Sequence, residues 1–481
     1  MVRQPLSVRP AIVAAGATAL GFAALTVTAL AHYQGSTAVF LLFCLSYALL
    51  AALIVPAPRL YAYTFFAALL LLGFWLKTVV HVVWEPGFSD PTGDFHNVPE
   101  EWDAALLAAA CAAAGAALAR AAQLLLARRG EGPPTAAPET PVPEYYIRYR
   151  KLAWWLTAFV VLALHLLNLR FAFFQVGVNL KLLLPWHLHT LAGWLVNIGL
   201  ALWISSLAWW EYRWEPARLS AVLWAPIVEG LLAAASGLSR LAYLLHAGPY
   251  WLALLERWAE FRCHLVRRSL IRLAGAFAAC FAAITVAVFV LRVLIHYEYA
   301  QSVPAGDSVA RQTRITIVRQ LPQLLVNRWC GLEGVLTVGA VPGRGLELLR
   351  AAVTEDPRSG ADALYQRYAK PWFLAEKPDK FTFLANAGAV AILWFSGSLM
   401  VVLAGMALVT ATMMLTEQLA LRLTGNPYLL AVAGAALANV VAQTTFPYLT
   451  AVFLAQLWVA ILFLGALQRL SPGRPAAERG P

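Results

Sequence analysis

The sequence predicts an all-α polytopic integral membrane protein, and three features lead to this fold class. The 481 residues are 61% hydrophobic and only 13% charged, whereas an average soluble domain is about half apolar and about a quarter charged. The apolar residues form long runs, not the alternating ~10-residue segments of a membrane β-barrel. So few charges exclude a soluble enzyme, a disordered chain and a disulfide-stapled secreted domain.

About twelve transmembrane helices are expected, because about 20 apolar residues cross a bilayer as a helix. The weakest of them are 219–235 and 238–256, which are short. Pro226, Gly237 and Pro249 interrupt these two segments, so ten crossings are the alternative. The expected spans are 10–32, 36–55, 60–83, 104–125, 152–172, 188–209, 219–235, 238–256, 273–296, 386–414, 427–444 and 448–468.

Charge predicts the orientation of these helices, since loops rich in Lys and Arg stay in the cytoplasm. Arginines gather around 128–151, around 257–272 and in the C-terminal tail, whereas 84–103 holds carboxylates without any Lys or Arg. Alternation places both termini and the arginine-rich segments in the cytoplasm. The acidic segment and the long segment 297–385 then lie outside, because long loops translocate largely regardless of charge.

A Pro-rich cytoplasmic linker is expected to separate a front part from the body of the protein. Short interfacial helices are expected near 345–354 and 360–369, within the long outer loop. The expected parts are a four-helix front part at 1–129, the linker at 130–151, central helices at 152–296, the periplasmic loop at 297–385, three helices at 386–468 and a cytoplasmic tail at 469–481.

Ionisable residues inside the predicted spans are candidate functional residues, because a charge at the bilayer centre costs about 2.5–3.5 kcal/mol. Lys77 and His81 lie four residues apart on one helix face, in the outer half of the third span. Glu229 lies mid-span and needs a cation, for which Arg240 is the first candidate and Lys77 the second. The alternatives are a lysine that reaches the interface and a purely structural ion pair.

The outer loop contains a basic amphipathic stretch, ARQTRITIVRQLPQLLVNRW, with no carboxylate between Asp307 and Glu333. The planar fork of arginine binds phosphate oxygens in pairs, so this stretch predicts a diphosphate site. The alternative is a basic face that binds anionic lipid headgroups. The candidate phosphate ligands in it are Arg311, Arg314 and Arg328.

No metal site or other cofactor is predicted. The sequence contains neither CxxC nor HExxH, and the histidines inside spans, His165 among them, are expected to be hydrogen-bonding groups near the interface. Asp90 and Asp94 are the alternative, as oxygen ligands for a divalent metal.

Several segments together resemble a known family. They are GFWLKTVVH followed by EPGFSDPTGDF, then PIVEGLLAAASGLSR, and NRWCGLEG in a long loop between late helices. With about twelve spans, they resemble the bacterial oligosaccharide-repeat-unit polymerases, the Wzy-type O-antigen and exopolysaccharide polymerases. The resemblance covers most of the chain.

The resemblance implies an inner-membrane enzyme that acts on undecaprenyl-diphosphate-linked oligosaccharides at the periplasmic face. It would transfer the growing glycan to a sugar hydroxyl of the next unit, without a metal or other cofactor. The implied partners are the membrane, the lipid-linked oligosaccharide, a chain-length regulator and a flippase, and no nucleic acid. The implied diphosphate ligands are Arg328, Arg240, Arg311, Arg314 and Lys77, and the rival general bases are Glu333, His81 and Glu229.

Three other functions stay open at this stage. A metal-dependent multi-spanning glycosyltransferase would use Asp90 and Asp94, and a glycan ligase would share the polymerase chemistry with a different acceptor. A transporter or flippase of an anionic lipid-linked substrate is the non-enzyme alternative. The charges gather toward the outer halves of the spans, which favours a site reached from outside.

Overall fold

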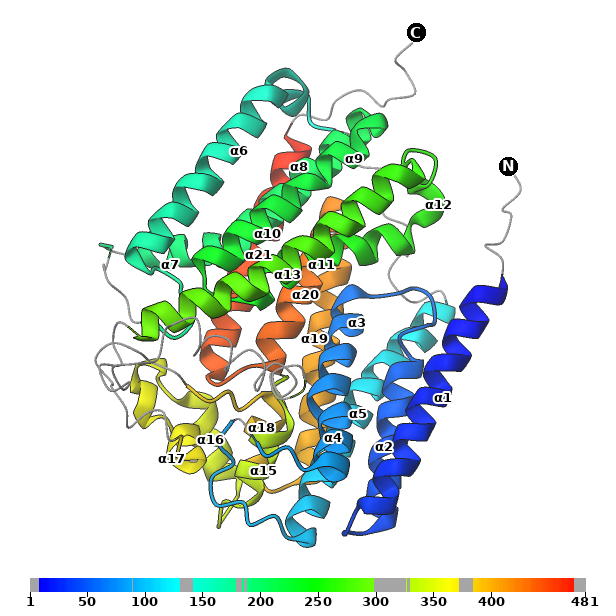
Figure 1. Ribbon diagram of the computed structural model, residues 1–481, viewed down its shortest axis with the longest axis vertical. Coiled ribbons are helices and arrows are strands. Elements are labelled where there is room, and N and C mark those ends of the chain that lie inside the picture. Colours follow the sequence, from blue (N-terminus) through cyan, green and yellow to red (C-terminus); the bar gives the residue numbers. More distant parts are fainter. Residues whose placement is uncertain are drawn as a thin grey trace, which may run out of the picture.

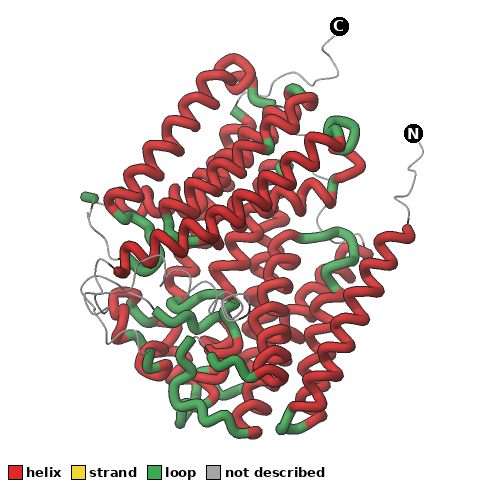
Figure 2. The backbone as a smooth tube through the Cα atoms, viewed as in Figure 1, coloured by secondary structure: helices red, strands yellow, loops and turns green. Residues whose placement is uncertain are grey.

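The computed structural model describes residues 8–88, 90–129, 142–178, 184–185, 188–297, 326, 329–371 and 384–470. Helices make up most of these residues, and loops connect them (Figure 2). The predicted all-α fold class is therefore confirmed for the part that the structure describes. Most of the predicted linker and of the stretch 298–328 lies outside the described residues.

The first half of the chain forms the front part and most of the central helices. The front helices are α1 (Val8–His32), α2 (Thr37–Ala52), α3 (Tyr61–Leu70), the π-helix η1 (Leu71–Leu76), α4 (Lys77–Trp84) and α5 (Pro99–Arg128). The central helices are α6 (Glu144–Phe171), α7 (Leu188–Trp194), the π-helix η2 (Leu195–Gly199), α8 (Leu200–Trp214), η3 (Pro216–Arg218), α9 (Leu219–Val222), α10 (Trp224–Ser236), α11 (Arg240–Glu256), α12 (Trp258–Phe261) and α13 (Arg267–Tyr297).

Short helices separate this part from three long C-terminal ones. The short helices are α15 (Leu332–Gly339), α16 (Leu346–Thr354), η4 (Pro357–Asp362), α17 (Leu364–Ala369) and α18 (Ala389–Trp394). The C-terminal helices are α19 (Leu399–Thr424), α20 (Pro427–Ala442) and α21 (Pro447–Arg469).

Within the described residues, eight helices are long and apolar enough to cross a membrane, which supports a polytopic membrane protein. Three shorter apolar helices are Gly16–His32, Thr37–Ala52 and Pro427–Ala442. The eight are Tyr61–Trp84, Pro99–Arg128, Glu144–Phe171, Leu188–Trp214, Pro216–Ser236, Arg267–Leu291, Leu399–Thr424 and Pro447–Arg469.

Two predicted boundaries are wrong, and glycines explain both. The predicted span 386–414 is divided, because Gly397 adopts φ +67° between α18 and α19, and Ser398 then caps α19 by accepting a bond from Val401 N. The predicted helix 360–369 is likewise interrupted: Gly360 breaks the regular backbone inside η4 with φ +51°, and α17 begins only after the extended Ala363.

The helices run in alternating directions, so their connections gather on two opposite faces (Figure 1). We call the face with segments 33–36, 85–98, 237–239 and 329–371 the loop face. At this face Asp103, near the start of α5, accepts a bond from Ser36 N at 3.0 Å.

The other end of α5 is fixed at the opposite face. Its buried Arg120 donates to the carbonyl oxygens of Leu53, Pro56 and Pro58 at 3.3, 2.8 and 2.7 Å. Asp103 and Arg120 of α5 therefore bind different interhelical loops on opposite faces, which fixes the position of the helix along the bundle axis.

Helix α20 lies at the centre and joins the two halves of the bundle. It packs against α3 on one side and against α8 and α11 on the other. Small residues permit this close packing, since a Cβ at Gly434 would lie 2.7 Å from Ala62 N. On α19, the buried Glu417 accepts bonds from Tyr61 N and Ala62 N at 2.8 and 2.7 Å, which satisfies the start of α3.

Candidate functional site

A buried ion pair joins the third membrane helix to the segment that follows α13. Lys77 Nζ lies 2.6 Å from both carboxylate oxygens of Glu333, and the two residues are 0% and 3% exposed. The pair brings together one predicted diphosphate ligand and one predicted general base. Charge-assisted bonds of this length are among the strong hydrogen bonds of proteins.

Close backbone packing positions the two partners. A Cβ on Gly73, four residues before Lys77, would collide with the carbonyl oxygen of Cys330. A Cβ on Gly334, next to Glu333, would collide with the carbonyl oxygen of Ala387. These glycines let the segment that starts α15 lie directly against the third membrane helix and against the chain before α18.

Burial sets the electrostatics of Glu333. Removal from water raises the pKa of its carboxyl group, and the negative charge of Asp90 raises this pKa further, while the Lys77 ammonium lowers it. Burial also raises the pKa of the neighbouring Cys330 thiol. A carboxyl group whose pKa is raised toward neutrality suits general acid–base chemistry.

The acidic segment 85–98 packs over α15 and α17 at the loop face. Thr337 Oγ1 donates to Pro91 O at 3.4 Å, and Lys370 Nζ binds both carboxylate oxygens of Asp94 at 2.6 and 2.7 Å. Asp94 thus pairs with an ammonium group. Among the residues that the structure describes, no group of three or more His, Cys, Asp and Glu is arranged to hold a metal ion.

His81 lies one turn after Lys77 in an aromatic cluster. It is 5% exposed, and its ring stacks on Phe88 with centroids 4.1 Å apart and planes 10° apart. Trp102, at the start of α5, lies against the same phenylalanine. Lys77, His81 and Glu333 therefore belong to one region beneath the acidic segment.

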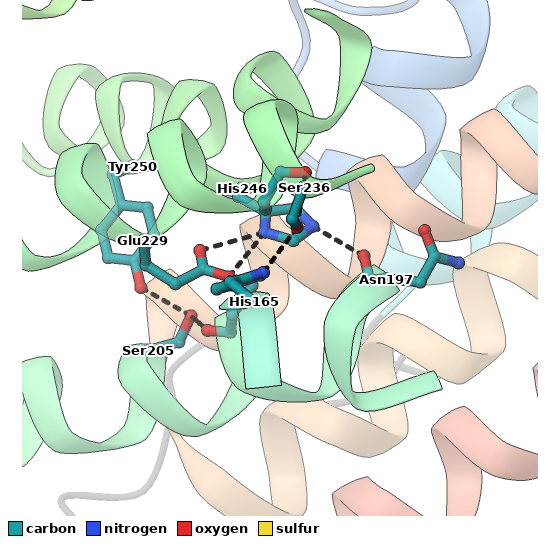
Figure 3. Close-up of polar contacts among 9 residues, drawn as sticks. His165, Asn197, Ser205, Glu229, Ser236, His246 and Tyr250 are labelled. Atoms are coloured by element: carbon teal, nitrogen blue, oxygen red, sulfur yellow. Dashed lines mark hydrogen bonds and ion pairs between the residues drawn. The ribbon is translucent and has the colours of Figure 1, made fainter. Parts of the chain in front are cut away.

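Glu229 belongs to a second buried cluster, and its predicted partners are wrong. Its carboxylate oxygens lie 2.9 and 3.0 Å from His246 Nδ1, and Oε1 lies 3.8 Å from His165 Nε2 (Figure 3). Lys77 pairs with Glu333 instead. The Arg240 guanidinium lies over the Phe289 ring, 4.8 Å from its centroid.

The π-helix η2 and the end of α10 complete this second cluster. His246 Nε2 lies 2.6 Å from the carbonyl oxygen of Asn197, which is in η2, where the wider turn changes the backbone pairing. His165 Nδ1 lies 2.8 Å from the Ser236 hydroxyl. His165 is thus buried inside the bundle and forms a hydrogen bond there.

The sequence carried a signal for the Glu229–His246 pair that the spacing rules did not use. Helices α10 and α11 form a hairpin around the turn at 237–239. Glu229 lies eight residues before this turn and His246 seven residues after it. In an antiparallel pair of helices, such positions lie at the same depth, so they face each other when both point inward.

The predicted phosphate ligands Arg311, Arg314 and Arg328 lie outside the described residues. Of the remaining predicted residues, the structure joins Lys77 to Glu333 directly and places Glu229 in the histidine cluster. Comparison of the chain with protein-family models, with curated proteins and with solved structures gives no match.

Proposed function

We propose that this protein polymerises undecaprenyl-diphosphate-linked oligosaccharide repeat units, as Wzy-type polymerases do, at the periplasmic face of the bacterial inner membrane. The observation that carries the proposal is the buried Lys77–Glu333 pair, which links a membrane helix to the segment between α13 and α19. Ionisable residues at membrane depth are rare and mark substrate sites more often than other residues do.

The proposal includes a topology of twelve crossings with both termini in the cytoplasm. The eight long apolar helices, the three shorter ones and α11 supply twelve passes. The acidic segment 85–98 lies on the loop face, whereas Arg128, Arg267 and Arg268 lie at the helix ends of the opposite face. The positive-inside rule then makes the loop face periplasmic.

The reaction transfers a glycan from the lipid diphosphate to a hydroxyl group of the next lipid-linked unit. The bond between the anomeric carbon and the diphosphate oxygen breaks, and a new bond to the acceptor oxygen forms. Glu333 takes the hydroxyl proton, and the lipid diphosphate leaves as an anion. Lys77 stabilises this anion together with three diphosphate ligands of the outer loop, Arg311, Arg314 and Arg328.

Glu333 is preferred over the two rival bases because of its surroundings. Glu229 is engaged by two histidines, and the His81 ring stacks on Phe88. Among the described residues, Glu333 is instead paired with one cation, Lys77. Because this pair is buried, the contacts around it must open before substrates reach Glu333.

A deletion strain tests the proposal. The strain is rescued with wild type, with Glu333→Gln, or with Glu347→Gln, which changes an exposed carboxylate on the nearby helix α16. Lipid-linked and surface glycans are separated on a gel, and protein amounts are checked by blot. We expect single repeat units without a ladder in the deletion strain and with Glu333→Gln, and a normal ladder with Glu347→Gln.

The other outcomes point to different functions. A normal ladder in the deletion strain contradicts the polymerase proposal, and a normal ladder with Glu333→Gln contradicts the role of the pair. Loss of even the single-unit band indicates an upstream transferase or flippase. If the protein is a ligase, the deletion strain keeps a full ladder on the polyprenyl lipid. If it is a metal-dependent glycosyltransferase, chelation of the metal abolishes its activity.

The transporter or flippase is the second candidate function, and the His165–Glu229–His246 cluster favours it. Buried histidine–carboxylate groups at membrane depth occur in proton relays of transporters. Transport of a lipid-linked unit predicts that the deletion strain accumulates this unit on the cytoplasmic leaflet, where an added periplasmic probe does not reach it.

A further inference from the structure

We propose that His165, Glu229 and His246 form a proton-binding site within the membrane part of the protein. The site shares one proton between Glu229 and His246, and it takes up a second proton at His165 Nε2. The site is separate from the Lys77–Glu333 pair, and the proposal does not depend on the polymerase activity.

The hydrogen bonds of His246 fix the first proton. Its Nε2 lies 2.6 Å from the carbonyl oxygen of Asn197, and a carbonyl oxygen only accepts, so Nε2 carries a hydrogen. Its Nδ1 faces both carboxylate oxygens of Glu229 at 2.9 and 3.0 Å. A ring nitrogen and a carboxylate at this distance bond only with a proton between them, so these two groups share one.

His165 provides the position for the second proton. The Ser236 hydroxyl donates to Ala233 O at 3.4 Å, so His165 Nδ1, 2.8 Å from this hydroxyl, carries the ring hydrogen. Its Nε2 is then the unprotonated nitrogen, and it is buried with no hydrogen-bond partner among the described residues. That Nε2 lies 3.8 Å from Glu229 Oε1. Figure 3 shows the His165 ring beside the Glu229 carboxylate. A proton added at Nε2 would become a donor aimed at this carboxylate, which relieves the cost of an unpaired buried nitrogen.

The surrounding helices supply few other charges toward the cluster. Tyr250 bonds to Ser205 at 2.8 Å, and Tyr428 of α20 stacks on the Tyr250 ring. The side chains of Arg292 and His296 on α13 lie outside the description. Other described ionisable groups on these helices include Arg170 on α6 over Phe171, Glu211 on α8 with Arg150 and Arg218, and Arg240 on α11 over Phe289.

The cluster lies near the loop face, which gives the second proton its route. Ser236 is the last residue of α10, and His165 lies six residues before the end of α6, a distance of about 9 Å along a helix. The chain of contacts from Glu229 through His165 to Ser236 leads toward this face. The second proton therefore comes from the loop face.

Uptake of this proton would strengthen the contact of α6 with α10. Only a minority of α6 is buried, and it packs on α10 and α8. The new bond from His165 to Glu229 would add an ionic link between α6 and α10. The exposed apolar residues of α6 include Trp155, Leu156, Phe159, Leu162, Leu166, Leu167 and Leu169.

Histidine NMR tests the proposal on the full-length protein in detergent micelles. The sample carries ¹⁵N-labelled histidine, and His165→Gln and His246→Gln assign the ring signals. We expect His165 to change from one protonated ring nitrogen at pH 8 to two at pH 5. In Glu229→Gln, His165 keeps one protonated nitrogen at both pH values, because the amide does not stabilise a neighbouring cation.

A matched control and a second readout separate this role from a structural one. Glu256→Gln removes a carboxyl group at the other end of α11 and is expected to leave the His165 change intact. Hydrogen exchange of α6, corrected for intrinsic rates, is expected to be slower at pH 5 than at pH 8 in the wild type. This difference is expected to vanish in Glu229→Gln.

Two results would overturn the proposal. One is a His165 ring with a single protonated nitrogen at both pH values in the wild type. The other is a Glu229→Gln variant with the wild-type change. If Glu229→Gln does not give monodisperse protein, His246→Gln provides the test in the opposite direction. His165 is then expected to carry two protons already at pH 8, as the remaining histidine beside the carboxylate, and wild-type behaviour contradicts the site.

Discussion

Two of the buried carboxylates of this protein, Glu333 and Glu229, differ in the cation that faces them. Glu333 faces Lys77, 256 positions away in sequence, whereas Glu229 faces His246, 17 positions away. A lysine beside a carboxylate brings a positive charge on one nitrogen, whereas an imidazole has two ring nitrogens at which protons can be bound or released. The first pair is therefore suited to hold a distant segment and a fixed charge, and the second is suited to respond to protons.

The largest effect on stability is expected when the fixed pair loses its cation. Lys77→Met leaves the Glu333 carboxylate buried without an ammonium partner, and breaking a buried pair costs about 3–5 kcal/mol. Unfolding of the purified protein in detergent, followed by tryptophan fluorescence, measures the loss. The double variant with Lys77→Met and Glu333→Gln is expected to recover part of it.

The matched control for this prediction is Lys370→Met. Lys370 and Asp94 form an equally short pair, but their side chains are 59% and 60% exposed. Exposed pairs contribute about 0–1 kcal/mol. Equal losses for the two lysine variants would show that burial does not distinguish these pairs.

The pH dependence of glycan polymerisation is the second prediction, and it rests on the proposed function. The Lys77 ammonium lowers the pKa of Glu333, against the effect of burial. Lys77→Gln removes this opposition, so the pKa of Glu333 rises and the carboxylate takes up its proton at a higher pH. Because the base acts deprotonated, the acid limb of the activity profile should move to higher pH. An unmoved limb in an assay with purified lipid-linked oligosaccharide would assign the base elsewhere.

A smaller effect is expected at the backbone contact that supports the fixed pair. A methyl group on Gly73 collides with the Cys330 carbonyl oxygen, and overpacking of this kind costs about 1–3 kcal/mol. Gly73→Ala should therefore lower the unfolding midpoint and weaken the glycan ladder. Gly21→Ala is the control, because a Cβ at Gly21 meets nothing within 4 Å. A Gly73→Ala variant as stable as Gly21→Ala would contradict the close approach.

The features of the fold that depend on local hydrophobicity were predictable from the sequence. Each predicted span coincides with a helix or with consecutive helices, because apolar length alone determines where a membrane helix can form. The boundaries failed where one glycine decides the backbone, as at Gly397. Ser396-Gly397-Ser398 is a turn signal at that point, but the apolar residues on both sides of it made 386–414 read as one span.

The site was predictable in its residues and not in its pairing. Lys77 and Glu229 were recognised because a charge at membrane depth needs a reason, whereas Glu333 was named as a candidate base of the outer loop. Their partners depend on which helices pack together, and this information is not contained in the spacing along one helix. Arg240 follows Glu229 closely in sequence, yet the residue that lies beside Glu229 is His165, from another helix. Only the hairpin symmetry of α10 and α11 made His246 accessible to prediction.

The smallest expected effect is the energetic coupling between Arg240 and Glu229, and it sharpens the contrast between nearness in sequence and contact in space. The Arg240 guanidinium lies over the Phe289 ring, an interaction of about 0.5–2 kcal/mol. The losses in free energy of unfolding from Arg240→Met and Glu229→Gln should therefore add within about 0.5 kcal/mol, as for independent sites. His246→Gln and Glu229→Gln share a hydrogen bond, so their losses should fall short of additivity by about 0.5–3 kcal/mol. Unfolding of the three single and the two double variants in one detergent measures both couplings. A large coupling between Arg240 and Glu229 would show that Arg240 is the cation that pairs with Glu229. Additive losses from His246→Gln and Glu229→Gln would contradict the shared proton.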